Sequence, residues 1–320
     1  MTEAPITCPA CSEPGAPGAT WCEACGADFA GEFEAVVGPP CVDCGADYGE
    51  ISDGYCSVCG RKQPAERDHM VEVLGDIAAV TDRGKRHHHN EDHFAIGVAG
   101  SATISIVADG VSTTDNPEHA SLGAAHAARD SLVTDLEAGE TDIEAALAKA
   151  VAAGQEAASS VEELPAGQGA ASTTIVATVV QPDEEDPTLV RTTTAWLGDS
   201  RAYWVQRDPN GEPGAFMATQ LMTDDVIGPS ISRWLGADAG DTSPSIQTFE
   251  HDAGTASSPA MLLSCSDGLW KYVPEAEQLA EVVTRLSTED QSTLDLAEAL
   301  VSFANEQGGH DNTTVIIVPT

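Results

Sequence analysis

Short apolar or alternating runs rich in β-branched residues recur from about Met70 to the C-terminus, and each predicts a β-strand. The predicted strands cover residues 71–80, 93–98, 102–108, 173–181, 189–197, 201–206, 259–265 and 314–318. Longer Ala-rich segments predict helices at 118–137, 142–160, 275–286 and 292–306. The strands come in groups and do not alternate strictly with helices, which favours an α+β layered fold over a doubly wound parallel sheet.

Local signals mark helix ends and loops in the same region. The run Thr141-Asp-Ile-Glu144 has the spacing of a capping box in front of the second helix. Gly308 and Gly309 are expected to stop the last helix. Residues 224–258 show little periodicity and are expected to form a mobile flap.

Residues 1–60 differ from the rest of the chain, because they are rich in Gly, Pro and Cys and contain no Lys or Arg. Eight of the nine cysteines form four Cys-x2-Cys pairs there: Cys8, Cys11, Cys22, Cys25, Cys41, Cys44, Cys56 and Cys59. Two intervening residues let both thiolates of a pair bind one ion, and a second pair completes a tetrahedral four-sulfur site. The spacing predicts two structural Zn²⁺ ions, with disulfides as the weaker alternative in a cytosolic chain.

The cysteine-rich segment resembles a double zinc ribbon. We expect this ribbon over residues 1–62, with sites at 8–25 and 41–59, then a linker at 63–70 and one larger domain at 71–320. Zinc would fold a module that is too small to fold on its core alone. Either this folding is the whole role of zinc, or the module also docks to a protein partner or regulates the larger domain. Binding of nucleic acid is disfavoured, because phosphate contacts need Lys or Arg.

The formal net charge of −38 at pH 7 discourages contact with nucleic acid and with anionic membranes. The N-terminal residues have no basic and apolar pattern of a signal peptide, and no run of about 18 apolar residues predicts a membrane span. We therefore expect a cytoplasmic protein. A site that acts on phosphate in so acidic a chain must cancel charge locally, and bound metal cations are an obvious means.

Four separated motifs place a carboxylate at the end of an apolar strand or just before one. They are Asn90-Glu91-Asp92, Val107-Ala-Asp109-Gly110, Leu263-Ser-Cys-Ser-Asp267-Gly268 and Gly309-His-Asp311-Asn312. A strand end holds a side chain rigidly and leaves it open to ligands, and glycine lets a backbone carbonyl approach closely. Ligation by oxygen alone suits Mg²⁺ or Mn²⁺. A lone Asp-Gly is usually a turn, but the ordered set predicts a metal site.

The series NED, ADG, GDSR, SDG and DN resembles the motifs of type 2C (PPM) Ser/Thr protein phosphatases over roughly residues 71–318. Gly198-Asp-Ser-Arg-Ala-Tyr203 carries the strongest match, and Ser232-Arg-Trp-Leu-Gly236 looks closest to actinobacterial members. The resemblance implies a four-layer αββα sandwich, in which helices flank two antiparallel sheets. It also implies hydrolysis of phosphoserine and phosphothreonine in proteins, with Ser/Thr kinases and their targets as partners.

The resemblance assigns a ligand role to each carboxylate. Asp109 would bridge two Mn²⁺ or Mg²⁺ ions, Gly110 (through its carbonyl) and Glu91 would complete one site, and Asp267 and Asp311 would hold the other. Two ions about 4 Å apart can share a water and lower its pKa toward neutrality, so that it attacks the phosphorus. 

Three further positions support this assignment. Asp92 and Asn312 would hold the ligands in place from behind, and Asp199 with Asp267 would bind a third ion, as proposed for bacterial members. Cys265 lacks the Cys-x5-Arg loop of cysteine phosphatases, and we expect it in the core.

The chain departs from the family where an arginine usually grips the substrate phosphate, because His87 stands at that position. Either Arg86 takes over by a small shift, or His87 binds phosphate when it is protonated, which would weaken binding at high pH. This change also leaves open a second hypothesis, a catalytically silent pseudophosphatase scaffold that displays the zinc ribbons for docking.

Overall fold

The computed structural model describes residues 6–7, 14–15, 39–52, 54–162, 169–183, 185–186, 188–255, 258–288 and 291–320. The chain forms two compact units, Met1–Pro64 and Ala65–Thr320. In the described part of the first unit, β1 (Ile6–Thr7) pairs with β2 (Pro14–Gly15), and β3 (Ile51–Ser52) pairs with β4 (Tyr55–Cys56). A 3-10 turn, η1 (Tyr48–Glu50), precedes β3. 

The second unit contains two large antiparallel sheets. The five-stranded sheet has the order β17 (Ser245–Asp252), β11 (Leu189–Leu197), β10 (Ile175–Pro182), β8 (Ala102–Ala108) and β7 (His93–Ala99). The seven-stranded sheet has the order β13 (Phe216–Gln220), β12 (Arg201–Arg207), β19 (Ser258–Cys265), β20 (Thr313–Pro319), β6 (Ile77–Asp82) and β5 (His69–Leu74), and β18 (Gly254–Thr255) joins β19.

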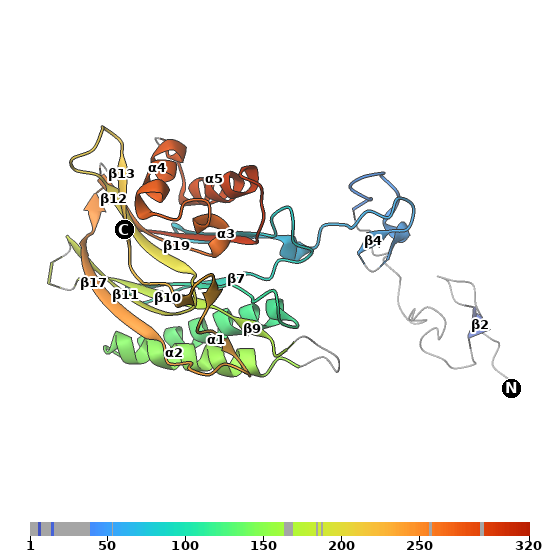
Figure 1. The fold of residues 1–320 in the computed structure, drawn as a ribbon, viewed down its shortest axis with the longest axis horizontal. Coiled ribbons are helices and arrows are strands. Elements are labelled where there is room, and N and C mark those ends of the chain that lie inside the picture. The colour runs from blue at the N-terminus through green and yellow to red at the C-terminus, as the bar shows by residue number, and fades with distance from the viewer. Residues whose placement is uncertain are drawn as a thin grey trace. The chain divides into compact units, whose positions relative to one another are not determined.

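Helices cover the outer face of each sheet (Figure 1). The pair α1 (Pro117–Glu137) and α2 (Ile143–Ser159) packs on the five-stranded sheet. On the other side, α4 (Ala276–Leu286) and α5 (Thr293–Glu306) pack on the seven-stranded sheet, close to the short helix α3 (Asp267–Trp270). The predicted αββα sandwich of two antiparallel sheets is confirmed.

Three apolar cores hold these four layers together. Small residues four apart on α1, such as Ala120, Ala124 and Ala128, form a buried stripe that lets α1 approach both α2 and its sheet. Large side chains such as Phe94, Trp204 and Leu262 fill the space between the two sheets. A third core lies between the seven-stranded sheet and α4 and α5. Each sheet is therefore buried on both faces, and its strand ends can be positioned precisely.

The predicted strand at 71–80 is wrong, because two strands, β5 and β6, form a hairpin there. Gly75 turns the chain between them with φ +62°, which only glycine adopts without strain. The remaining predicted strands and all four predicted helices occur within a few residues of the expected bounds.

The other local expectations need smaller corrections. Asp142, not Thr141, caps α2, since its side chain accepts a hydrogen bond from the Ala145 N–H at 3.0 Å. Gly308 and Gly309 do end α5, both with positive φ. The expected flap is partly regular, because β17 adds an edge strand to the five-stranded sheet.

The rest of the expected flap forms short pairs. Strands β14 (Val226–Ile227) and β15 (Ser230–Ile231) make a small hairpin, and β16 (Leu235–Gly236) pairs with β9 (Ser172–Thr173). A last 3-10 turn, η2 (Glu66–Asp68), leads into β5. Among the described helices, none is long and apolar enough to cross a membrane.

Candidate metal centre

The central strands of both sheets end at one pocket with a volume of about 490 Å³. Asp109 and Gly110 follow β8, Asp199 lies between β11 and β12, Asp267 opens α3 after β19, and Asp311 precedes β20. All five line this pocket. The structure thus brings together carboxylates that are up to 202 residues apart in the sequence, from Asp109 to Asp311.

The backbone of Asp109 is fixed by two threonines of the neighbouring strand region. Thr174 N–H donates to the Asp109 carbonyl at 2.8 Å, and Thr173 Oγ1 donates to the same carbonyl at 2.9 Å. In return, Asp109 N–H donates to Thr174 Oγ1 at 3.2 Å. A side chain at Gly110 would place its Cβ 2.6 Å from the Glu91 carbonyl oxygen, so the close approach requires glycine.

Asn312 ties the loop that carries Glu91 to the start of β20. Its Oδ1 accepts from the Glu91 N–H at 2.8 Å, and its Nδ2 donates to the carbonyls of Arg83 at 2.8 Å and His89 at 3.0 Å. Asn312 is 2% exposed, so no water competes for these bonds. It supports the pocket from behind and does not line it.

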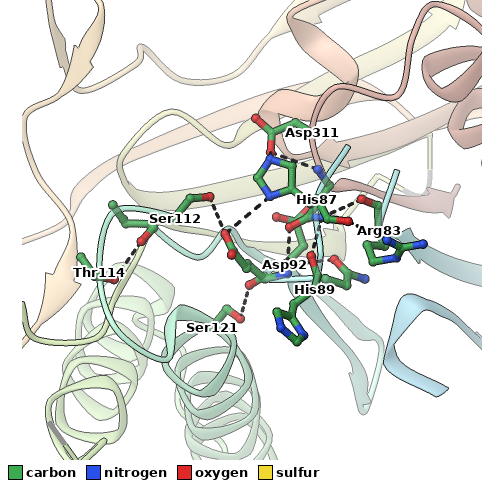
Figure 2. A network of polar contacts seen from close by, with 12 residues as sticks. Arg83, His87, His89, Asp92, Ser112, Thr114, Ser121 and Asp311 are labelled. Carbon is green, nitrogen blue, oxygen red and sulfur yellow. Dashed lines mark hydrogen bonds and ion pairs between the residues drawn. The ribbon is translucent and has the colours of Figure 1, made fainter. Parts of the chain in front are cut away.

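Two serines that the sequence did not reveal also hold Glu91. Ser112 Oγ donates to Glu91 Oε2, and Ser121 Oγ donates to the Glu91 carbonyl at 2.5 Å (Figure 2). The first contact fixes the carboxylate and the second fixes the backbone. Serine is too common for either contact to be read from sequence alone.

Asp92 is buried behind the pocket, with 1% of its surface exposed. Thr314 Oγ1 donates to its Oδ2 at 2.7 Å. Burial raises the pKa of Asp92 to about 6, although hydrogen bonds from Ser266 and Thr314 act in the opposite direction. 

The pocket carboxylates raise one another's pKa values. Burial, followed by the charges of Asp92, Asp267 and Asp311, raises the pKa of Asp109 well above its usual range. Burial and then Asp311 raise the pKa of Asp267 to about 7. Burial and then Asp224 raise the pKa of Asp199. So many mutually repelling oxygen ligands fit divalent cations such as Mn²⁺ or Mg²⁺, which would relieve the repulsion.

Lys271 was not expected at this site. Its Nζ forms an ion pair with Asp267 Oδ2, one helical turn earlier, and a second with Asp311 Oδ2 at 3.3 Å. Burial disfavours its charged form, but the attraction of Asp267 and Asp311 outweighs this and raises the pKa of Lys271. Lys271 therefore carries a permanent positive charge among these carboxylates.

His87, one of the two expected phosphate ligands, lies against the carboxylates (Figure 2). Its Nε2 is 3.1 Å from Asp311 Oδ1 and its Nδ1 is 3.9 Å from Glu91 Oε2. Arg83 Nη1 donates to the His87 carbonyl at 2.6 Å and holds the loop in this position. Arg86 is exposed and makes no hydrogen bond or ion pair with any residue that the structure describes.

Arg201, from the GDSR motif, is committed to structural contacts at the edge of the same pocket. Its Nε and Nη2 bind the two oxygens of Asp224 at 3.0 and 2.7 Å, and its Nη1 donates to the Pro274 carbonyl at 2.7 Å. Its guanidinium group lies 3.9 Å from the centre of the Trp270 ring. Arg201 therefore links β12 to the start of the flap, through Asp224, and to the segment after α3, through Pro274.

Cys265 is fully buried in β19, and burial raises the pKa of its thiol. The expected core role is confirmed, since a buried thiol without a lowered pKa is not a nucleophile.

A separate cysteine cluster lies in the first unit. The ligand atoms of Cys41, Cys44, Cys56 and Cys59 all lie within 4.8 Å of one another. The distances Cys41 Sγ–Cys59 Sγ and Cys44 Sγ–Cys56 Sγ are both 3.6 Å. Four sulfurs bound to one Zn²⁺ at about 2.3 Å stand roughly 3.8 Å apart, so the cluster has the right size for zinc.

The turns around the cluster also fit a zinc site. In each Cys-x2-Cys turn, the glycine that follows donates its N–H to the carbonyl of the first cysteine, Gly45 to Cys41 at 2.9 Å and Gly60 to Cys56 at 2.8 Å. A backbone hydrogen bond from Cys44 lowers the pKa of Cys41 to about 6, whereas the pKa values of Cys44 and Cys59 are raised, because burial and contacts with the other thiols outweigh their backbone hydrogen bonds. Zinc binds thiolates, so it would displace protons from this cluster. The other expected site, Cys8, Cys11, Cys22 and Cys25, lies outside the described residues.

Comparison with known proteins identifies the family. A family model described as protein phosphatase 2C matches residues 81–305. The chain is 29% identical over 250 residues to the serine/threonine phosphatase stp of Listeria innocua, across 74% of this chain and 93% of that protein. The chain belongs to the protein phosphatase 2C family.

Solved structures agree with this assignment. The serine/threonine phosphatase PstP/Ppp of Mycobacterium tuberculosis superposes with a TM-score of 0.55 at 27% identity, over 75% of this chain and 96% of that one. A serine/threonine phosphatase of S. agalactiae shares the fold at 19% identity, with a TM-score of 0.55 over 78% of this chain and 98% of that one.

Proposed function

We propose that this protein is a Ser/Thr protein phosphatase that uses Mn²⁺ or Mg²⁺ to hydrolyse phosphoserine and phosphothreonine in proteins. The observation that carries the proposal is the single pocket into which Asp109, Gly110, Asp267 and Asp311 project from both sheets. Membership of the protein phosphatase 2C family supports it. The similarity to bacterial serine/threonine phosphatases supports a role in kinase signalling in the cytoplasm, with Ser/Thr kinases and their targets as partners.

In this proposal Asp109 would contribute to the sites of two ions, Glu91 and the Gly110 carbonyl would help to hold one of them, and Asp267 and Asp311 would hold the other. When bound, the ions supply a water of lowered pKa and positive charge facing the phosphate oxygens. The hydrogen bonds of Asn312 and Thr314 keep Glu91 and Asp92 in place before any ion arrives. A third ion on Asp199 and Asp267 belongs to the same proposal, because both residues line the pocket.

The phosphate group needs a further cationic contact. His87 is the better supported of the two expected residues, since its imidazole already lies 3.1 Å from Asp311 at the centre of the carboxylate set. Arg86 is exposed on the same loop and serves as the alternative.

A phosphothreonine peptide with Mn²⁺ tests the activity directly. Purified full-length protein should release phosphate, and Asp267→Asn should abolish the release. Asp130→Asn, which changes an exposed carboxylate on α1, is the matched control and should keep full activity. Failure of the wild-type protein to release phosphate between pH 6 and 9, with Mn²⁺ shown to bind, would favour the silent scaffold instead.

We further propose that the first unit holds two structural Zn²⁺ ions and docks a protein partner. The proposal is supported by the four converging sulfurs of Cys41, Cys44, Cys56 and Cys59. Elemental analysis should find two zinc ions per chain, Cys56→Ser should reduce this to one, and Cys265→Ala should leave it at two. A zinc content that Cys56→Ser does not change would contradict the site.

A further inference from the structure

We propose that Lys271 is a tethered counter-ion of the metal centre, which competes with the divalent ion for Asp267 and Asp311. The inference rests on the proposed metal site at these two residues and concerns how that site is loaded. In this role Lys271 lowers the affinity of the pocket for the divalent ion.

The contacts of Lys271 join two separate elements. Asp267 lies four residues earlier, at the start of α3, and a lysine at that spacing pairs with a carboxylate in many helices. The second partner, Asp311, lies 40 residues later, in the segment that leads into β20. Local helical pairing does not explain this second contact. The Nζ group therefore occupies the space between the two carboxylates that are proposed to hold one ion.

Of the positively charged side chains that line the pocket, Lys271 is the one that contacts Asp267 and Asp311. Among the described residues that line it, Arg201 and Lys271 carry positive charge, against Asp109, Asp199, Asp224, Asp267 and Asp311. Arg201 is held by two bonds to Asp224 and by the Pro274 carbonyl, so it cannot turn toward the other aspartates. The other oxygen of Asp311, Oδ1, is contacted by His87 Nε2 at 3.1 Å and accepts a hydrogen bond from the Asn312 N–H at 3.0 Å.

A divalent ion on Asp267 and Asp311 would compete with the ammonium group, because Lys271 already contacts Oδ2 of both carboxylates, and His87 and the Asn312 N–H contact Oδ1 of Asp311. The Lys271 side chain is 51% exposed and ends a flexible four-carbon stem, so it can swing toward solvent. Metal loading is then an exchange of one cation for another. The two ion pairs of Lys271 stabilise the metal-free protein. The ammonium group also weakens metal binding, since two positive charges a few ångströms apart repel each other.

Calorimetric titration of Mn²⁺ into full-length protein dialysed free of Mn²⁺ tests the inference. Lys271→Met should bind the ion at Asp267 and Asp311 at least about fivefold more tightly than the wild type. Lys149→Met is the matched control, because Lys149 pairs with Asp135 between α1 and α2, far along the chain from the pocket residues. It changes the net charge equally and should leave the affinity unchanged.

Melting temperature gives a second readout that does not depend on activity. Without Mn²⁺, Lys271→Met should melt below the wild type, and saturating Mn²⁺ should raise its melting temperature by more than it raises that of the wild type. Lys271→Gln, which keeps a polar end group, should behave in the same way. Arg at this position keeps the charge, so Lys271→Arg should bind Mn²⁺ no more tightly than the wild type.

The possible results distinguish the competition by Lys271 from the existence of the metal site. If Asp267→Asn weakens Mn²⁺ binding but Lys271→Met and Lys271→Gln bind as the wild type does, the competition is wrong and the metal site stands. Weaker binding by both lysine variants would also overturn it, by showing that Lys271 supports the ion. If Asp267→Asn has no effect on Mn²⁺ binding, the proposed metal site fails, and the inference fails with it.

Discussion

Asn312 and Glu91 are 221 residues apart in the chain, yet the Glu91 N–H donates a 2.8 Å hydrogen bond to Asn312 Oδ1. The same side chain donates to the carbonyls of Arg83 and His89. One buried amide therefore holds the loop that carries His87 and Glu91, and this loop brings His87 Nε2 to 3.1 Å from Asp311 Oδ1. 

Asn312→Ala should reduce phosphatase activity by about 10- to 100-fold, the range found when the support of a metal ligand is lost. It should also lower the free energy of unfolding by about 1–3 kcal/mol, because three part-buried backbone groups lose their partner. Asn210→Ala, in the exposed turn after β12, is the control. Activity assays with Mn²⁺ and urea unfolding would measure both effects, and an active Asn312→Ala protein would show that the loop is held without this residue.

Gly268 lies close to the backbone carbonyl of the same asparagine. A Cβ at position 268 would overlap the Asn312 carbonyl oxygen, and it would also come within 2.7 Å of Thr313 Oγ1. Gly268→Ala should therefore shift α3 away from β20, with a loss of stability of about 1–3 kcal/mol and weaker Mn²⁺ binding at Asp267.

Gly240→Ala provides the comparison for this substitution. Nothing lies within 4 Å of a Cβ built at Gly240, and its φ is not in the left-handed region. Its melting temperature should stay within about a degree or two of the wild type, in line with an exposed surface substitution. Equal melting temperatures for the two variants would mean that the backbone near Gly268 yields easily.

The convergence of these carboxylates on one pocket could be predicted from the sequence, because each carboxylate follows or precedes a strand that is buried on both faces. Once Asp109, Asp267 and Asp311 are placed at strand ends, the sandwich has few ways to keep them apart. The apolar runs of the central strands and the Ala-rich helices were also readable, since a fully buried element has a strong pattern.

Edge elements and tertiary partners were harder to predict. Strand β17 has the sequence Ser-Ile-Gln-Thr-Phe-Glu-His-Asp and contains no fully buried residue, so its weak alternation gives no clear strand pattern. The hairpin at Gly75 was not predicted, although Gly75-Asp76 interrupts the apolar pattern of residues 71–80. Lys271 could be paired with Asp267 by its spacing, but its contact with Asp311 depends on how α3 and β20 meet.

His251 gives the stability of the protein a defined pH dependence. Its ring stacks on Trp204 with centroids 4.2 Å apart, and burial lowers its pKa to about 4. In the unfolded chain a histidine has a pKa of about 6.5. Between these values the unfolded state binds more protons than the folded state, so the free energy of unfolding falls as pH falls from about 6.5 toward 4.

Urea unfolding at pH 7 and pH 5 should show that His251→Phe loses less stability on acidification than the wild type does. His251→Phe should remove only part of the pH dependence of stability, because burial and His126 also lower the pKa of His93, to about 3. Thr192→Val removes the 2.9 Å contact between Thr192 Oγ1 and His251 Nε2 without removing the titrating group. It should lower stability by a similar amount at both pH values, and an unchanged pH dependence in His251→Phe would contradict the assignment.

Arg201 and Asp224 form a buried pair whose loss should be costly. Their side chains are 10% and 14% exposed, and Arg201 also donates to Tyr203 Oη at 3.1 Å. Arg201→Met should lower the free energy of unfolding by about 3–5 kcal/mol, because Asp224 is left without its counter-ion. Arg201→Lys should recover only part of this, since an ammonium group cannot bind both oxygens in parallel.

A double-mutant cycle with Asp224→Asn distinguishes the pair from two independent effects. The double variant should be less destabilised than the sum of the single variants by about 0.5–3 kcal/mol, because the second change removes the charge that the first left unpaired. Arg191→Met serves as the control. Arg191 pairs with Glu250, and their side chains are 44% and 59% exposed, respectively. An exposed pair of this kind contributes roughly 0–1 kcal/mol. Additive losses for Arg201→Met and Asp224→Asn would show that the two residues stabilise the flap separately, and the pocket wall would then not depend on their contact.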